Sequence, residues 1–244
     1  MIKFKNILLI AILSILVYAC SKDNGLIGDD FDHAEQALKD QDTLTKYLGM
    51  YYYDATVDSI KPLVSGKTAL IDDVNLSVQN ITHEEVDYKL YYYTIHQGAP
   101  DPVKGFPTVM DSVLTRYQGS QITGTDLIEV FETQNSPSWF VLDEVVKGWT
   151  NGFTNFKGGK NVTGNGPITY QDSGKGYLFF PSGLGYRNSQ TGNVGANRCL
   201  IFKFELLDIV EDTDHDNDGL PSIFEIEDAA VESDPTKVDT DVDF

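Results

Sequence analysis

Alternating side chains over residues 86–95 place the tightest limit on how this chain can fold. The two interleaved sets are Tyr88, Leu90, Tyr92 and Thr94, and Lys89, Tyr91, Tyr93 and Ile95. Because successive side chains of a strand point to opposite faces of a sheet, this period of two predicts a β-strand. Three consecutive tyrosines are typical of a strand whose sheet is partly covered on both faces.

The rest of residues 86–210 has the same character, with short apolar strands, one short helix and glycine-rich turns. Residues 31–48 differ, because their apolar side chains follow helical spacing. We expect one or two helices there, with a break near residues 40–42. The chain is therefore predicted to be an α+β protein with an N-terminal extension of helix and strand over residues 31–85 and an acidic C-terminal tail over residues 211–244.

The formal net charge of −19 over 244 residues is concentrated in that tail. From Glu211 to Phe244 there are 13 acidic residues and one basic residue, which account for −12 of the −19. Such a tail repels phosphates, and the chain has no basic stripe that could release counterions from a nucleic acid. We therefore expect no nucleic-acid partner.

The first twenty residues are typical of a bacterial export signal. Lys3 and Lys5 precede an apolar stretch over residues 7–17, which is shorter than the roughly 20 residues that a membrane-spanning helix needs. The stretch leads into Leu16-Val17-Tyr18-Ala19-Cys20, a branched residue, a small residue and then a cysteine. This order resembles the lipobox of bacterial lipoproteins.

The lipobox resemblance implies that residues 1–19 are a signal peptide and that Cys20 is acylated. Residues 20–30 are then a lipid-anchored tether, and the protein belongs to the cell envelope, at the outer membrane on its periplasmic face or at the cell surface. Each methylene of a buried lipid chain contributes about 0.8 kcal/mol to such anchoring. The alternative is an ordinary secretory signal with an accidental cysteine. Cys199 lies in an apolar run and is expected to be a buried thiol.

Six separated motifs resemble, in order, those of the FK506-binding (FKBP) family of peptidyl-prolyl isomerases. They are Val113-Leu114-Thr115-Arg116-Tyr117-Gln118-Gly119, Val130-Phe131-Glu132-Thr133, Pro137-Ser138-Trp139-Phe140-Val141-Leu142, Glu144-Val145-Val146-Lys147-Gly148-Trp149, Tyr177-Leu178-Phe179-Phe180-Pro181-Ser182-Gly183-Leu184-Gly185-Tyr186 and Leu200-Ile201-Phe202-Lys203-Phe204-Glu205-Leu206-Leu207. Together they cover roughly half of the chain.

This resemblance implies an FKBP-like antiparallel half-barrel sheet wrapped around one short helix, with an isomerase domain over residues 86–210. It also implies a pocket in which Trp149 forms the floor, Tyr186 donates its hydroxyl to a substrate carbonyl, and Val194 closes one edge. The other pocket residues implied by family position are Tyr117, Phe131, Glu132, Val145, Val146 and Phe202. For each of these residues, plain packing in the core is the alternative.

The chemistry of prolyl isomerisation agrees with this set of residues. Rotation about an X-Pro bond needs neither a nucleophile nor a metal, so we expect no cofactor for catalysis. The planar amide is held behind a barrier of about 18–20 kcal/mol. Because the planar amide is more polar than the twisted one, a dry aromatic pocket favours the transition state over the ground state. A thousandfold acceleration needs only about 4 kcal/mol.

Several positions depart from the family pattern and bear on the strength of catalysis. Glu132 stands where the family has an aspartate, and Ser138 where it has a phenylalanine, although Trp139 is adjacent. The glycine expected after the pocket tyrosine is Arg187. A polar, glycine-rich insertion occupies residues 160–176, and we expect either a flap over the site or a tolerated surface loop.

The acidic tail contains a spacing typical of calcium loops. Asp214, Asp216 and Asp218 occupy positions 1, 3 and 5, a glycine occupies position 6, and Glu225 occupies position 12. The expected calcium ligands are these four carboxylates and the Leu220 carbonyl. The surroundings resemble the aspartate-rich repeats of thrombospondin type 3 as much as an EF-hand. A solvated acidic tail without metal is the alternative.

Three functions follow from these features. The first is a peptidyl-prolyl isomerase that assists folding of exported proteins, with proline-containing polypeptides as clients. The second is a non-catalytic FKBP-like binding or chaperone module whose altered pocket rim is a docking site. The third is a calcium-stiffened surface lipoprotein. A peptide isomerisation assay separates the first from the second, and calcium calorimetry tests the third.

Overall fold

The computed structural model describes residues 31–124 and 128–231, and all of its helices and strands belong to one compact unit that begins at His33. The helices are α2 (His33–Met50), η1 (Leu70–Asp72), α3 (Lys147–Gly152), η2 (Phe153–Asn155), η3 (Ser182–Leu184) and α4 (Ser222–Val231). The strands are β1 (Tyr51–Asp54), β2 (Ser59–Pro62), β3 (Leu76–His83), β4 (Val86–His96), β5 (Ser112–Ile122), β6 (Ile128–Val141), β7 (Lys160–Asn161), β8 (Tyr170–Gln171), β9 (Gly174–Phe180) and β10 (Leu200–Val210).

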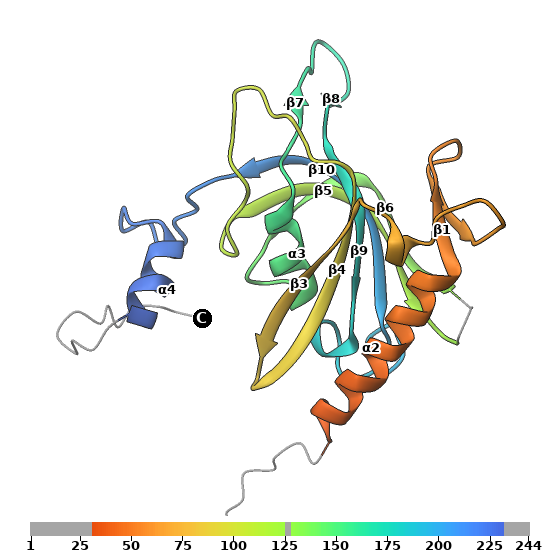
Figure 1. The fold of residues 1–244 in the computed structure, drawn as a ribbon. Helices are drawn as coiled ribbons and strands as arrows, with labels where there is room; N and C mark the ends of the chain where they lie inside the picture. Colours follow the sequence, from red (N-terminus) through yellow and green to blue (C-terminus); the bar gives the residue numbers. More distant parts are fainter. Residues whose placement is uncertain (1–30, 125–127, 232–244) are drawn as a thin grey trace, which may run out of the picture. The chain divides into compact units, whose positions relative to one another are not determined.

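One antiparallel sheet organises the fold (Figure 1). Its six strands follow the order β3-β4-β9-β10-β5-β6, and every neighbouring pair is antiparallel. The hairpins β1–β2 and β7–β8 are separate two-stranded sheets. The predicted α+β class, with an antiparallel sheet and few helices, is confirmed.

The central strands bury both of their faces, in two different cores. On β9, Leu178 and Phe180 enter a core that contains α3, whereas Tyr177 and Phe179 enter a core that contains α2. Figure 1 shows the two helices on opposite sides of the sheet. The prediction from the tyrosine run, a sheet covered on both faces, is therefore confirmed. We call these clusters the α3 core and the α2 core.

The N-terminal extension shares the sheet with the region that resembles an isomerase domain. β3 pairs with β4 along its whole length, from Leu76 opposite Tyr93 to His83 opposite Val86. The predicted boundary between residues 31–85 and 86–210 therefore falls within the turn of one hairpin. Removal of residues 31–85 would therefore take strand β3 out of the sheet.

Helix α2 runs unbroken from His33 to Met50, so the expected break near residues 40–42 is wrong. Aspartate weakens a helix when its side chain competes for the local backbone. Here the Asp40 carboxylate instead accepts hydrogen bonds from Ser182 and Gln36. Asp42 pairs with Lys46, one turn later, at 2.5 Å. Both carboxylates are thus engaged by partners that leave the helical hydrogen bonds untouched.

The lipoprotein signal, Cys20 and the tether over residues 20–30 lie outside the described residues. Among the residues that are described, no helix combines the length and apolar character needed to cross a membrane.

The two leucines of α2 give a matched test of its role in the fold. Leu44 is 0% exposed in the α2 core, whereas Leu38 is 74% exposed on the same helix. We expect Leu44→Ala to lower the free energy of unfolding by about 2–5 kcal/mol and Leu38→Ala by less than about 0.5 kcal/mol. Urea denaturation measures both. Equal effects of the two substitutions would show that α2 does not fold as part of the same unit.

Candidate active site

A cavity of about 260 Å³ lies where α3, the sheet and the loop after η3 meet. Its lining is formed by Tyr117, Glu132, Phe140, Glu144, Val145, Val146, Trp149, Tyr186 and Phe202. Seven of the nine pocket residues expected from family position are in this lining. Phe131 and Val194 are not, and Phe140 and Glu144 are present in addition. The role of these residues in catalysis stays a prediction.

The Trp149 ring is the centre of an aromatic box. It is 4% exposed and opens α3, where its backbone N–H donates to the Val146 carbonyl at 2.7 Å. Its ring centroid lies 4.8 Å from that of Tyr117, 5.3 Å from Phe140 and 5.1 Å from Phe202. All three contacts are edge-to-face, the geometry that aromatic quadrupoles favour. The indole is thereby fixed as one wall of a largely apolar hollow.

Two hydroxyl groups and two carboxylates, those of Glu132 and Glu144, provide the polar side chains of the lining. The Tyr117 hydroxyl hydrogen-bonds to the Glu132 carboxylate, and burial together with this acceptor raises the pKa of Tyr117 above its usual range. Burial and the nearby charge of Glu132 also raise the pKa of Tyr186. Both hydroxyls therefore keep their protons at neutral pH. Because Tyr117 is bonded to Glu132, Tyr186 is the better placed of the two to donate to a substrate carbonyl.

Phe131 packs behind the cavity wall. Its ring centroid lies 5.7 Å from that of Phe202, and a Cβ on Gly119 would lie only 2.5 Å from the ring. Glycine at 119 thus makes room for the phenylalanine on the neighbouring strand. Val194 is buried in the α3 core, and its loop is clamped by Gln121, whose amide bonds to the backbone of Asn193 and Gly195. Phe131 thus contacts the lining residue Phe202, and Val194 belongs to the same core.

Phe140 takes the wall position that the departure at Ser138 seemed to leave empty. Its ring contacts Tyr117 and Trp149, whereas Trp139 is 50% exposed. The Ser138 hydroxyl instead accepts a hydrogen bond from Gln134 at 2.9 Å. Sequence reasoning missed Phe140 because it matched motif positions one by one. The period of two along β6 was the available signal, since it places Phe140 on the face opposite to Trp139.

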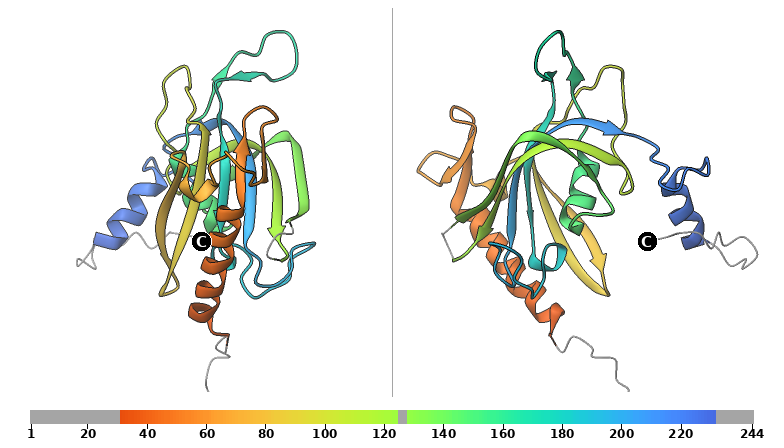
Figure 2. Two further views of the ribbon diagram at one scale, coloured as in Figure 1. Left: turned by 45° about the vertical axis from the view of Figure 1, so that its right-hand side comes forward. Right: turned by 180° about the vertical axis from the view of Figure 1, so that it is seen from behind.

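The insertion over residues 160–176 contains the β7–β8 hairpin and the start of β9. The hairpin is tied by a Lys160–Asp101 ion pair at 2.6 Å and by a Tyr170–Asp208 hydrogen bond at 2.9 Å. Figure 2 shows it at one end of β9, while η3 lies at the other end. Since Tyr186 follows η3, the hairpin is remote from the cavity, and none of the described hairpin residues lines it.

A larger hollow of about 340 Å³ has a different chemistry. It is lined mainly by polar and charged side chains, among them Arg116, Lys175, Lys203, Glu205 and Asp58. Several of these side chains are already paired, because Lys203 binds Asp58 at 2.9 Å and Lys175 lies 3.5 Å from Glu205. Although larger, it lacks the apolar walls that would exclude water from a proline ring.

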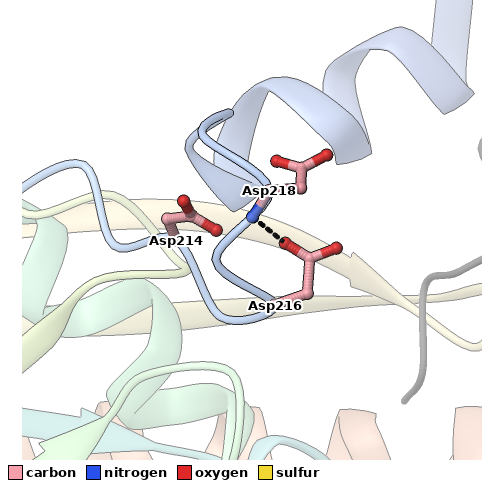
Figure 3. A group of neighbouring side chains, drawn as sticks. All are labelled: Asp214, Asp216 and Asp218. Atoms are coloured by element: carbon pink, nitrogen blue, oxygen red, sulfur yellow. Dashed lines mark hydrogen bonds between the residues drawn. The ribbon is translucent and has the colours of Figure 1, made fainter.

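The predicted calcium residues form a compact loop (Figure 3). Carboxylate oxygens of Asp214, Asp216 and Asp218 lie within 4.8 Å of one another. The Asp214 carboxylate accepts the backbone N–H groups of Asn217 at 2.7 Å and Gly219 at 2.9 Å, and that glycine has a φ of +100°. Oxygen ligands at this spacing suit a hard cation such as calcium. The loop thus gathers three of the predicted ligands.

The other two predicted ligands are Glu225 and the Leu220 carbonyl. Glu225 lies in the first turn of α4, outside the three-carboxylate group, and Leu220 is exposed just before that helix. His215 is turned away, with its Nδ1 2.9 Å from the Ser222 hydroxyl. The structure therefore brings together three of the four predicted carboxylates.

Comparisons with known proteins identify relatives for about half of the chain. No protein-family model matches it. The FKBP-type peptidyl-prolyl cis-trans isomerase FkpA of Escherichia coli K12 is 32% identical over 120 residues, which are 49% of this chain and 37% of the relative. A probable FkpA of Neisseria meningitidis is 31% identical over 104 residues, 42% of this chain and 33% of the relative. The peptidyl-prolyl cis-trans isomerase Mip of Coxiella burnetii is 29% identical over 104 residues, 42% of this chain and 39% of the relative.

The chain thus spans between a third and two fifths of the length of these relatives. The crystal structure of FkpA from Escherichia coli has 27% identity and a TM-score of 0.39, and the match covers 54% of this chain and 52% of that one. Several relatives are named as peptidyl-prolyl cis-trans isomerases at about 30% identity. At this moderate identity, and over about half of the chain, these relatives support membership of the FKBP-type peptidyl-prolyl isomerase family.

Proposed function

We propose that this protein catalyses cis/trans isomerisation of X-Pro bonds in exported polypeptides. The observation that carries the proposal is the aromatic cavity, in which Tyr117, Phe140, Trp149 and Phe202 surround a hollow with one hydroxyl, that of Tyr186, available at its edge. The volume of about 260 Å³ is large enough to accommodate a proline ring. The relatives named as isomerases support the same activity.

The proposed mechanism is a rotation with no covalent step. When a proline ring of the substrate packs on Trp149, the ring and the amide that precedes it are removed from water. The planar amide loses more solvation than the twisted one, because its resonance makes it more polar, so the barrier falls. The Tyr186 hydroxyl donates to the substrate carbonyl and holds the peptide while the bond turns. Val145 and Val146 cover the side of the ring next to α3.

A non-catalytic binding module is the competing proposal. The departures from the family pattern favour this binding module, because residues such as Glu132 alter the edge of the cavity. The same cavity would then hold a proline-containing segment without accelerating its rotation. A protease-coupled assay with a short X-Pro peptide separates the two, because a binding module inhibits the coupled cleavage or leaves it unchanged.

Two neighbouring aromatic residues of β6 allow a matched test of the cavity. Phe140 is in the lining and Trp139 is half exposed outside it. We expect Phe140→Ala to lower kcat/KM for a prolyl peptide about tenfold, since a loss of about 1.4 kcal/mol in transition-state binding has this effect. Trp139→Ala should change it by less than about twofold. If both variants keep the wild-type rate, the cavity is not the catalytic site.

We further propose that the loop around Asp216 binds calcium. The proposal is supported by the clustered carboxylates and by the glycine turn that follows them. Asp214, Asp216 and Asp218 would supply carboxylate oxygens, and Glu225 and the Leu220 carbonyl would complete the set. Ligation of this kind would order the acidic segment next to the sheet.

Calorimetry with calcium chloride tests this second proposal. We expect wild-type protein to bind with a dissociation constant between about 10⁻⁶ and 10⁻³ M, the range of EF-hand sensors and extracellular modules. Asp216→Asn removes one anionic ligand and should weaken binding at least about tenfold. Asp212→Asn, in the same segment but outside the loop, is the control and should leave binding unchanged. Absence of heat with wild type would refute the calcium site.

The cell-envelope location rests on residues 1–20, and we propose that a lipid on Cys20 anchors the protein. The two cysteines provide the test. In a bacterial host, Cys20→Ser should abolish incorporation of labelled palmitate and move the protein from the membrane fraction to the soluble one. Cys199→Ser, at the buried thiol, should keep both label and membrane association. Labelled Cys20→Ser protein would rule out this anchor.

A further inference from the structure

Asp40 lies on helix α2, and its carboxylate is buried against the η3 loop, which is 142 residues further along the chain. The side chain is 3% exposed. Its Oδ2 accepts hydrogen bonds from the backbone N–H of Ser182 at 2.8 Å and from the Ser182 hydroxyl at 2.6 Å. Its Oδ1 accepts from the Gln36 amide at 2.7 Å. The N-terminal extension thereby holds one particular residue of η3 through two bonds.

Ser182 in turn fixes the backbone on both sides of Tyr186. The Ser182 carbonyl accepts the N–H of Gly185 at 2.9 Å and the N–H of Arg187 at 2.8 Å. These two residues flank the tyrosine whose hydroxyl lies in the cavity lining. A continuous path of hydrogen bonds therefore runs from the Asp40 carboxylate, through Ser182, to the peptide groups that orient the Tyr186 ring.

Two further contacts hold the loop in place. The Tyr88 ring lies so close to Gly183 that a Cβ there would be 2.3 Å from it. Arg187 has a φ of +57°, a strained value for a residue with a side chain, and it forms an ion pair with Glu84. This strain is consistent with a backbone that its neighbours force into one arrangement.

A buried carboxylate is a costly way to pack a helix against a loop. Burial raises the pKa of Asp40, although the Ser182 and Gln36 donors oppose the shift. An apolar side chain would fill the same space without this desolvation cost. What an apolar residue cannot do is accept two hydrogen bonds from Ser182. The two hydrogen bonds from Ser182 to Asp40 are therefore better explained by orientation of the η3 loop than by packing of α2 against it.

We infer that Asp40 is a positioning residue for Tyr186, which sets the tyrosine hydroxyl for the substrate carbonyl by way of Ser182. This inference rests on the proposed isomerase function. It makes α2, which contributes no residue to the cavity lining, a determinant of catalytic rate.

A double-mutant cycle on the full chain tests the inference. We expect Tyr186→Phe to lower kcat/KM for a prolyl peptide about five- to tenfold, the effect of losing one hydrogen bond in the transition state. Asp40→Ala should lower it by a similar factor. The double variant should be no slower than either single one, because Asp40 acts only through the tyrosine hydroxyl. Effects that multiply would overturn the inference.

A conservative variant and a control separate positioning from simple destabilisation. In Asp40→Asn the amide oxygen can still accept both Ser182 bonds while the Gln36 amide turns over, so this variant should keep the wild-type rate. Gln41→Ala, at the next residue of α2, removes a hydrogen bond to Tyr91 instead. It should lower thermal stability and leave kcat/KM unchanged. If Asp40→Asn is as slow as Asp40→Ala, the charge or the helix matters, and positioning is refuted.

Amide hydrogen exchange distinguishes failure of the inference from failure of the proposed function. Exchange of the Gly185 and Arg187 amides should be faster in Asp40→Ala and unchanged in Asp40→Asn, whether or not the protein is an isomerase. Unchanged exchange in Asp40→Ala overturns the inference even if wild type is active. Wild type without isomerase activity refutes the proposed function, and exchange then decides whether Asp40 orders the loop. If Asp40→Ala does not fold, Ser182→Ala, which loses one of the two bonds, takes its place in both measurements.

Discussion

Burial of both faces of the central strands is the constraint on which the rest of this structure depends. β4, β9 and β10 place alternate side chains in the α3 core and the α2 core. Neither face of these strands can be left open to water without exposing a row of aromatic rings. The sheet therefore requires the α2 layer. Because α2 helps to cover the central strands, it also stabilises the strands that form the cavity on the opposite face.

The cavity combines two demands that oppose each other. A dry aromatic hollow lowers the barrier to amide rotation, but it also penalises every polar group at its edge. The lining meets both demands by engaging Tyr117 with Glu132, while burial raises the pKa of Tyr186 further above neutral pH and keeps its hydroxyl a donor. Glutamate at position 132 has a longer side chain than the aspartate of the family pattern. Its carboxylate hydrogen-bonds to the Tyr117 hydroxyl across the strand pair β5–β6.

Prediction from sequence succeeded where a residue's neighbours along the chain determine its direction. The tyrosines of β4 showed that both faces of the sheet are covered, and Trp149, three residues after Val146, was recognisable in the first turn of its helix. It was less successful where direction depends on a partner strand. Phe131 and Val194 were expected in the lining and lie outside it, where Phe131 packs against Phe202 and Val194 belongs to a loop held by Gln121. Phe140 was overlooked for a different reason, because the period of two along β6, which places it opposite to Trp139, was not applied there.

The sequence by itself determined the α+β class, the strand that the tyrosines form, most of the residues around the cavity and the acidic loop with calcium spacing. These features follow from local periodicity and from motifs whose order is written in the chain. Only the tertiary structure decided that α2 continues through Asp40, that the insertion lies at the far end of β9, and that Asp40 meets Ser182. A carboxylate 142 positions away from its partner leaves no mark in local periodicity, because the bond exists only once both faces of the sheet are covered.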